Sequence, residues 1–246
     1  IYFILCFVFL LFILSAMGGA FKGVNVVVGS SNEKVFVNSP YQIHMIMAAL
    51  SPFLMLFLCA AFSGSVIQKD FGFNVHSLYF TKPISKFNYL FGKFAASFVT
   101  QLFVFSSFLL AYFLAKYLPW INQDYFMDVN ILAYIMPYFT IIIPNMFFIG
   151  AIFFSIALYS RKMQTVYVGS VIFLITYLIS QVFMESLDLK TIGTFLDPFG
   201  VTASDRMSDY FSVVDKNSLL ITLKGMLLYN RLMYFAIAAF IMIYVY

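Results

Sequence analysis

Long apolar runs separated by short polar segments dominate the pattern along this chain. Several runs exceed 18 residues with almost no charged side chain, the length with which an α-helix crosses the hydrocarbon core of a bilayer. The runs do not alternate apolar and polar residues, as the strands of a transmembrane β-barrel would. The pattern therefore predicts an all-α membrane protein, with residues 1–246 forming a single transmembrane domain of six helices. The expected spans are about 1–20, 41–67, 88–118, 131–160, 166–184 and 231–246.

Composition supports this interpretation. The chain is 63% hydrophobic and 10% charged, whereas soluble domains carry about 25% charged residues. The net charge of +4 comes without a large basic cluster, which argues against a nucleic-acid partner. Cys6 and Cys59 fall in apolar runs and are interpreted as small hydrophobic residues. Because the chain starts and stops inside apolar runs, we expect it to be a fragment of a longer protein.

Basic residues in short loops predict the orientation. The loop between the second and third spans and the loop between the fourth and fifth are the most basic. Their basic residues are Lys69, Lys82, Lys86 and Lys93 in the first loop, and Arg161 and Lys162 in the second. The loop between the third and fourth spans is acidic, with Asp124 and Asp128. We therefore expect both basic loops and both chain ends to be cytoplasmic, in a membrane such as the bacterial inner membrane.

No motif for enzyme chemistry is found. The predicted topology puts His44 and His76 on opposite sides of the membrane, so they cannot share a metal or haem. No H-E-x-x-H or phosphate-binding G-x-x-x-x-G-K-[ST] motif is present. We also expect no histidine to lie where it can activate a serine. The sequence predicts a chain that is not an enzyme and that binds no cofactor or metal of its own.

Two pairs of small residues sit four apart inside the predicted spans. They are Ala60 with Gly64, and Gly92 with Ala96. Such pairs let helix backbones approach closely, although they also arise by chance in an apolar sequence. Both interpretations have about equal weight.

The fourth span carries two prolines and a polar residue at depth. Pro137 and Pro144 each remove a backbone donor and tend to kink the helix. Asn145 either faces a cavity or a neighbouring helix, or it bonds the carbonyl groups that the proline frees. The second interpretation is favoured somewhat.

The basic loop around residues 68–94 has an unusual aromatic pattern. On a helix from Phe71 to Thr81, one face carries Phe71, Val75, Leu78 and Tyr79, and the other carries Phe73, His76, Ser77 and Phe80. Asp70 near its start would complement the helix dipole, Pro83 would end it by disfavouring helical geometry at Lys82, and Ser85 or Asn88 would cap the next helix.

Two apolar faces in a cytoplasmic loop require two surfaces to cover them. One surface is the membrane domain, and the other is a separate protein that receives the helix in a groove. The alternative is an interfacial loop whose lysines contact anionic lipid headgroups. These residues alone leave both interpretations open.

The same loop resembles the one between the second and third spans of ABC type-2 export permeases. The matching features are Asp70, Gly72, the predicted helix, Pro83-Ile84-Ser85-Lys86 and Gly92-Lys93. The stretch 81–90, Asp197-Pro198-Phe199-Gly200 and Asn230-Arg231 are similar to a branch whose permease is fused to a zinc aminopeptidase-like domain. The chain departs from the commoner members in its longer gap between Gly72 and Pro83 and in its single acidic residue.

The resemblance implies a coupling helix that docks on a separate ATP-binding cassette subunit, which holds the ATP and magnesium. It also implies a second copy, or a second six-span half, as a partner of this chain in an exporter. The implied ATPase contacts are Asp70, Phe73, His76, Ser77, Phe80, Lys82 and Pro83, and the residues that pack on the membrane domain are Phe71, Val75, Leu78 and Tyr79. The alternative is a membrane anchor or scaffold that transports nothing. Neither substrate nor transport direction follows from the sequence.

The family also has short helices between the fifth and sixth spans, directed towards the outer leaflet. Leu219 to Leu228 suits such a helix, because Leu220, Leu223 and Leu227 would share a face. Asp197-Pro198-Phe199-Gly200 is interpreted as a structural turn without substrate contact.

Overall fold

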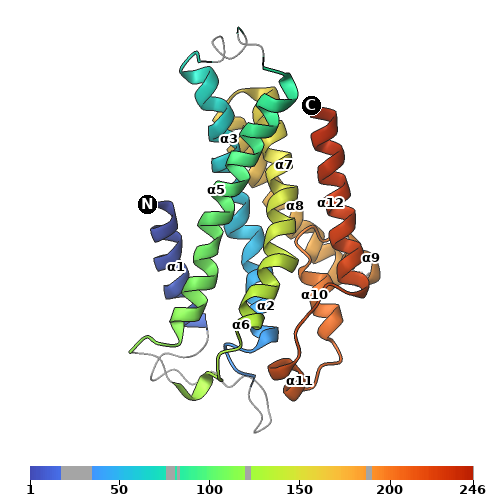
Figure 1. The fold of residues 1–246 in the computed structure, drawn as a ribbon. Helices are drawn as coiled ribbons and strands as arrows, with labels where there is room; N and C mark the ends of the chain where they lie inside the picture. The colour runs from blue at the N-terminus through green and yellow to red at the C-terminus, as the bar shows by residue number, and fades with distance from the viewer. Residues whose placement is uncertain (18–34, 76–80, 82–83, 120–122, 187–189, 246) are drawn as a thin grey trace.

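The computed structural model describes residues 1–17, 35–75, 81, 84–119, 123–186 and 190–245. All regular elements in these ranges are helical, and the long ones run roughly side by side (Figure 1). The long helices are α1 (Tyr2–Met17), α2 (Pro40–Leu50) continuing into α3 (Leu56–Gly72), α5 (Lys86–Ala115), α6 (Ile131–Pro137) continuing into α7 (Ile143–Ser160), α8 (Met163–Ser186) and α12 (Gly225–Val245). Three short helices, α9 (Lys190–Leu196), α10 (Val201–Ser208) and α11 (Val213–Ser218), lie between α8 and α12.

Five of the helical segments in the described residues are long and apolar enough to cross a membrane. They are Pro40–Gly72, Lys86–Ala115, Ile131–Ser160, Met163–Met184 and Gly225–Val245. These segments make the chain an integral membrane protein and confirm five of the expected spans. The first expected span is described only as α1, which has 16 residues and packs along α5; residues 18–20 of that expected span lie outside the described part.

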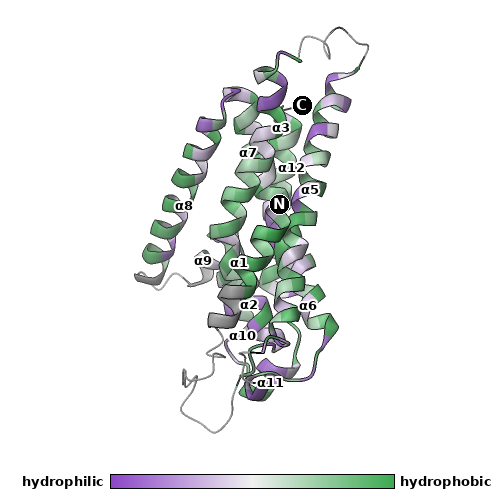
Figure 2. Ribbon diagram, turned by 90° about the vertical axis from the view of Figure 1, so that its left-hand side faces the viewer, coloured by the Kyte–Doolittle hydropathy of each residue, from purple (hydrophilic) through white to green (hydrophobic). Residues whose placement is uncertain are grey.

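The segment Ile131–Ser160 forms the centre of the bundle. Helix α7 contacts α3, α5, α8 and α12, and most of the apolar part of this segment is buried. Helix α8 is peripheral, because little of its apolar surface is buried. In Figure 2 most of its length stands apart from the other helices. Its exposed apolar side chains, such as Ile172 and Val182, suit contact with lipid.

Proline interrupts two of the membrane segments. Tyr138–Ile142 is a π-helical turn between Pro137, the last residue of α6, and Pro144 near the start of α7. A second π-helical turn, Ser51–Met55, contains Pro52. A missing amide donor frees carbonyl groups, and the wider turn accommodates them. The π-helical turn shows that the helix departs from α geometry between Pro137 and Pro144, and the expected kinks stay a prediction.

The last span begins earlier than expected, at Gly225 rather than Arg231. The expected helix from Leu219 to Leu228 is wrong, because Leu219 is extended and residues 219–224 are not helical. Gly225 has a positive φ of 52°, a conformation that glycine adopts easily, and it starts α12. Ile221 and Leu227 instead bury their side chains against Ala203 of α10.

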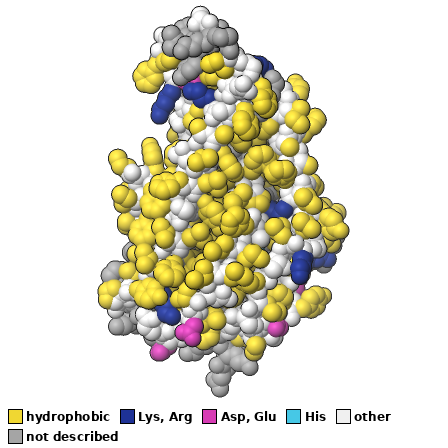
Figure 3. All heavy atoms as spheres, in the orientation of Figure 1, with side chains coloured by type: hydrophobic (Ala, Val, Ile, Leu, Met, Phe, Trp, Pro, Cys, Tyr) yellow, Lys and Arg dark blue, Asp and Glu magenta, His cyan; other side chains and the backbone are white. Residues whose placement is uncertain are grey.

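The charged side chains mark the two ends of the bundle. A wide apolar belt covers its middle; the upper end carries basic side chains, and the lower part carries acidic side chains together with further basic ones (Figure 3). The upper end, here called the basic end, comprises the C-terminal end of α3, the N-terminal end of α5, the α7–α8 turn and the end of α12 (Figure 1). Its described basic residues are Lys69, Lys86, Lys93, Arg161 and Lys162.

Candidate functional site

The link between α3 and α5, residues 73–85, is the candidate functional site, and Asp70 fixes its base. Lys93 Nζ lies 2.8 Å from the Asp70 carboxylate, and the Tyr89 hydroxyl donates to the same carboxylate at 2.5 Å. Asp70 is only 6% exposed. It stands in the last turn of α3, where the helix dipole disfavours an acid, and Lys93 offsets that cost. The expected placement of Asp70 at the start of a separate helix is therefore wrong.

Both ends of the link have defined backbone caps. Helix α3 runs on through Phe71 and Gly72, and Asn74 then takes a left-handed conformation with φ of 55°. A single helix from Phe71 to Thr81 is incompatible with this break. At the other end the Ser85 hydroxyl accepts a hydrogen bond from the backbone amide of Asn88 at 3.2 Å, which confirms the expected cap of α5.

The described residues that the sequence analysis assigned to the coupling helix differ in exposure. Phe73 is 76% exposed, whereas Phe71 is half-buried against the core and stacks under the Arg161 guanidinium, 4.7 Å from its ring centre. Val75 is half-buried. Asp70, assigned to a partner from the sequence, faces α5. The other expected residues lie outside the described part of the chain: His76, Ser77, Leu78, Tyr79, Phe80, Lys82 and Pro83.

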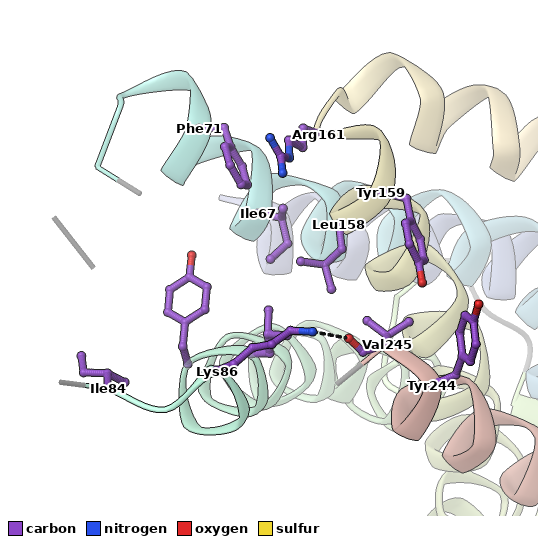
Figure 4. Close-up of a pocket in the computed structure, with 11 residues that line it drawn as sticks. Ile67, Phe71, Ile84, Lys86, Leu158, Tyr159, Arg161, Tyr244 and Val245 are labelled. Carbon is purple, nitrogen blue, oxygen red and sulfur yellow. Dashed lines mark hydrogen bonds between the residues drawn. The ribbon is translucent and has the colours of Figure 1, made fainter. Parts of the chain in front are cut away.

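A groove of about 570 Å³ opens beside the base of this link. In Figure 4 Phe71 and Arg161 lie on one side of it, Lys86 lies on the other, and Ile67 and Leu158 lie between them. Lys86 reaches from α5 to the last turn of α12 and donates to the Val245 carbonyl at 3.4 Å. The described residues that line it are Ile67, Phe71, Ile84, Lys86, Tyr89, Leu90, Leu158, Tyr159, Arg161, Tyr244 and Val245.

A second polar cluster, which the sequence analysis missed, lies far from the basic end around Arg231 of α12. Arg231 is 4% exposed. Its guanidinium donates to the side-chain oxygens of Asn145 and Asn230 and to the carbonyl groups of Pro198 and Phe199. The Asn145 amide also donates to the Phe199 carbonyl at 3.0 Å. Asn145 thus faces neighbouring segments, and the favoured interpretation as a cap for freed carbonyl groups is wrong.

The turn Asp197-Pro198-Phe199-Gly200 completes this cluster. The Asp197 carboxylate accepts hydrogen bonds from the backbone amides of Phe199 at 2.9 Å and Thr202 at 2.7 Å. These bonds close the turn just before α10. The Asn230 amide donates to the Asp197 carbonyl at 2.9 Å. The predicted turn is confirmed, and its carbonyl groups join the α9–α10 segment to α7 and α12; the absence of a substrate contact stays a prediction. Three sequence signals existed (Asn145, the turn and Asn230-Arg231), but nothing in their spacing showed that they meet.

One histidine contacts a serine, and the geometry of the pair bears on the expectation that no histidine activates one. His44 Nε2 lies 2.8 Å from Ser204 Oγ, and Ser204 itself donates to the Gly200 carbonyl at 2.7 Å. His44 Nε2 is therefore the donor to Ser204. Both residues are at most 1% exposed, so a substrate cannot reach this pair. The arrangement holds α10 on α2 and does not activate a nucleophile.

Within the described residues, no three His, Cys, Asp or Glu side chains gather as a metal site. Comparisons with known proteins add no identity. No family model, curated protein or solved structure matches this chain.

Proposed function

We propose that this chain is the transmembrane subunit of an ABC exporter. In this proposal it has six spans, with α1 as part of the first, and it lies in a cytoplasmic membrane of bacterial type with both of its ends on the cytoplasmic side. A separate cassette subunit binds ATP and magnesium and docks on the α3–α5 link. A second copy of this chain, or a second six-span half, completes the translocation path.

The observation that carries the proposal is the contrast between Phe73 and Asp70. Phe73 leaves the bundle at its basic end with 76% of its surface exposed, three residues after a carboxylate that is tied to α5. A large exposed aromatic residue on a fixed base is suited to a protein partner. The excess of basic residues at this end supports its placement in the cytoplasm, where a cassette subunit would lie.

The same contacts suggest how the link transmits force. Asp70 belongs to α3, whereas Lys93 and Tyr89 belong to α5. A push on the link by the closing ATPase would therefore move both helices together. Helix α3 packs directly against α7 and α8, so the motion would reach the centre of the bundle and the peripheral helix. At the far end, Arg231 would carry motion of α12 into the α9–α10 segment.

The proposal is tested by replacing Phe73 with Asp. The tagged protein is purified from its native membranes in mild detergent, and retained proteins are identified by mass spectrometry. We expect the wild type to retain a protein with a phosphate-binding G-x-x-x-x-G-K-[ST] motif, and Phe73→Asp to lose it by about tenfold or more, since truncation at an interface hot spot costs at least about 2 kcal/mol. Phe80→Asp is made alongside it, because the sequence assigns Phe80 to the same contact set.

Tyr210→Asp is the matched control, because Tyr210 is an aromatic residue with 96% exposure near α10, away from the basic end. This variant should retain the ATPase. If the wild type retains no such ATPase, the exporter proposal fails and the alternative, a membrane anchor or scaffold, is favoured. If both Phe73→Asp and Tyr210→Asp lose the ATPase, the loss reflects a general defect and Phe73 is not the contact.

A further inference from the structure

The groove at the basic end combines two cations with an apolar floor. Lys86 and Arg161 are its charged lining residues, and no acidic side chain lines it among the described residues. Ile67, Leu90 and Leu158 supply apolar surface. Its volume of about 570 Å³ falls in the range of pockets that hold small ligands, roughly 300–1,000 Å³. This chemistry selects a ligand that is anionic at one end and apolar at the other.

The groove lies where such a ligand is abundant. Lys86 begins α5, and Val245 ends α12, and both helices are membrane segments. Exposed apolar side chains flank the groove on each helix, including Phe87 and Phe91 on α5 and Ile243 on α12. Such a surface faces lipid tails, while the cations lie at headgroup level. A groove at the ends of two membrane segments is within reach of lipid headgroups.

Arg161 has an unusual backbone conformation. It takes a left-handed conformation, with φ of 54°, at the C-terminal cap of α7, a position that usually carries glycine or asparagine. Its guanidinium carbon lies over the Phe71 ring, 4.7 Å from the ring centre. A guanidinium presents five N–H donors and pairs well with phosphate oxygens.

We propose that this groove binds one anionic phospholipid of the adjacent leaflet. The phosphate lies between Arg161 and Lys86, and the first part of an acyl chain lies along Ile67 and Leu158. The lipid links the α7–α8 turn to the start of α5. The proposal does not depend on the exporter function; it requires only that the basic end lies at a membrane surface. It commits to a lipid rather than a free phosphate because most of the groove lining is apolar.

The test compares phosphatidylglycerol with phosphatidylcholine of the same acyl chains. The full chain in detergent is titrated with each lipid, and bound lipid is counted by native mass spectrometry. We expect tighter binding of phosphatidylglycerol, and the double variant Lys86→Gln/Arg161→Gln should lower that affinity about 100-fold, roughly tenfold for the direct hydrogen bond of each cation to the phosphate. Should the double variant precipitate, Lys86→Gln alone should lower the affinity about tenfold.

The matched control is Lys69→Gln/Lys162→Gln, which removes two exposed cations of the same end that do not line the groove. It should leave the affinity nearly unchanged. Equal losses in the two double variants would reduce the effect to surface attraction and overturn the proposal. Competition by glycerol 3-phosphate as strong as that by phosphatidylglycerol would also overturn it, because the site would then bind a free anion as well as a lipid.

A protein occupant would give a third result. If the groove variant releases a cassette ATPase while its phosphatidylglycerol affinity stays at the wild-type level, the groove serves a protein and the lipid proposal fails. This readout is separate from the Phe73 experiment. Either proposal can therefore fail while the other stands.

Discussion

Arg231 of α12 donates a hydrogen bond to the side-chain oxygen of Asn145 of α7, although 86 positions separate them in the sequence. The same guanidinium also reaches the Pro198 and Phe199 carbonyl groups. One buried cation thus joins two membrane helices to the turn before α10. A buried charge is costly unless its donors are satisfied, and here backbone and amide oxygens satisfy them in place of a carboxylate.

Replacing Arg231 with Met is expected to destabilise the protein by about 3 kcal/mol, because removing one partner of a buried charged network leaves the others unsatisfied. The Asn145 side-chain oxygen and the Pro198 carbonyl would lose donors. Arg231→Lys should recover only part of the loss, since an ammonium lacks the planar fork that reaches several oxygens. Thermal unfolding in detergent, followed by intrinsic fluorescence, measures the change. Lys224→Met, at an exposed cation just before α12, should leave the midpoint near that of the wild type; an equal fall in both would contradict the role of the network.

Gly200 leaves room for the same arginine. Its φ is +75°, and a Cβ there would lie 2.5 Å from Arg231 Nη2. Gly200→Ala should therefore cost roughly 2 kcal/mol through backbone strain and displacement of the guanidinium. The control is Gly92→Ala, in the helix α5, where a Cβ would meet nothing within 4 Å. Helix propensity predicts that this control is neutral or slightly stabilising. Unfolding midpoints that fall equally in both variants would refute the argument.

The periodicity of apolar residues located the long helices well, because burial in lipid requires an unbroken apolar stretch with all backbone bonds made internally. The Ser85 cap was likewise local and predictable. The start of α12 was not, since the polar stretch that ends at Asn230 looked like a loop, while the groups that Asn230 and Arg231 bind lie on other segments. A buried arginine is recognised only when the groups that satisfy it are known.

The two pairs of small residues likewise could not be interpreted without knowing which helices lie beside them. A Cβ on Gly64 would lie 2.6 Å from Met163 Sδ, so α3 and α8 do approach closely there. Gly92, with the same spacing pattern, is exposed and has no such neighbour. The motif states that close approach is possible, and the neighbouring helix decides whether it occurs. In the candidate site, the sequence predicts partner contacts for Phe73 and Asp70, which stay a prediction, but it did not show that Asp70 belongs to α3 and binds Lys93.

Gly64 provides a test of the contact between α3 and α8. Gly64→Leu should destabilise the protein by about 1–3 kcal/mol, because the added side chain meets Met163 and Val166. Met163→Ala should restore part of that loss when combined with Gly64→Leu, since it removes the nearest obstructing atoms. A double-mutant cycle on unfolding midpoints measures the coupling. Strictly additive effects would show that the two residues do not share a contact.

If the chain binds an ATPase as proposed, Asp70 affects that contact either directly or through α5. If it positions the α3–α5 link, Asp70→Asn and Lys93→Met should weaken ATPase retention by a similar factor, and the double variant should be no worse than either single one. The physical reason is that both substitutions break the same ion pair, 2.8 Å long. Retention is measured by quantitative co-purification, with circular dichroism to confirm that the helices persist. A large effect of Asp70→Asn together with normal retention in Lys93→Met would instead indicate direct contact.

The orientation of the bundle is tested by cysteine labelling. In a background with Cys6→Ser and Cys59→Ala, single cysteines replace Ser85 and Lys162 at the basic end and Tyr210 near α10; all three positions are exposed. A membrane-impermeant maleimide added to intact cells should label only Tyr210→Cys, because basic short loops remain on the cytoplasmic side. Ser85→Cys and Lys162→Cys should react only after permeabilisation. Lys162→Cys removes a charge, so a second variant with Gln164→Lys, at an exposed position, keeps the loop basic and controls for an altered insertion. Labelling of Ser85→Cys from outside would reverse the topology, and the basic end could then meet neither a cytoplasmic ATPase nor the lipids of the cytoplasmic leaflet.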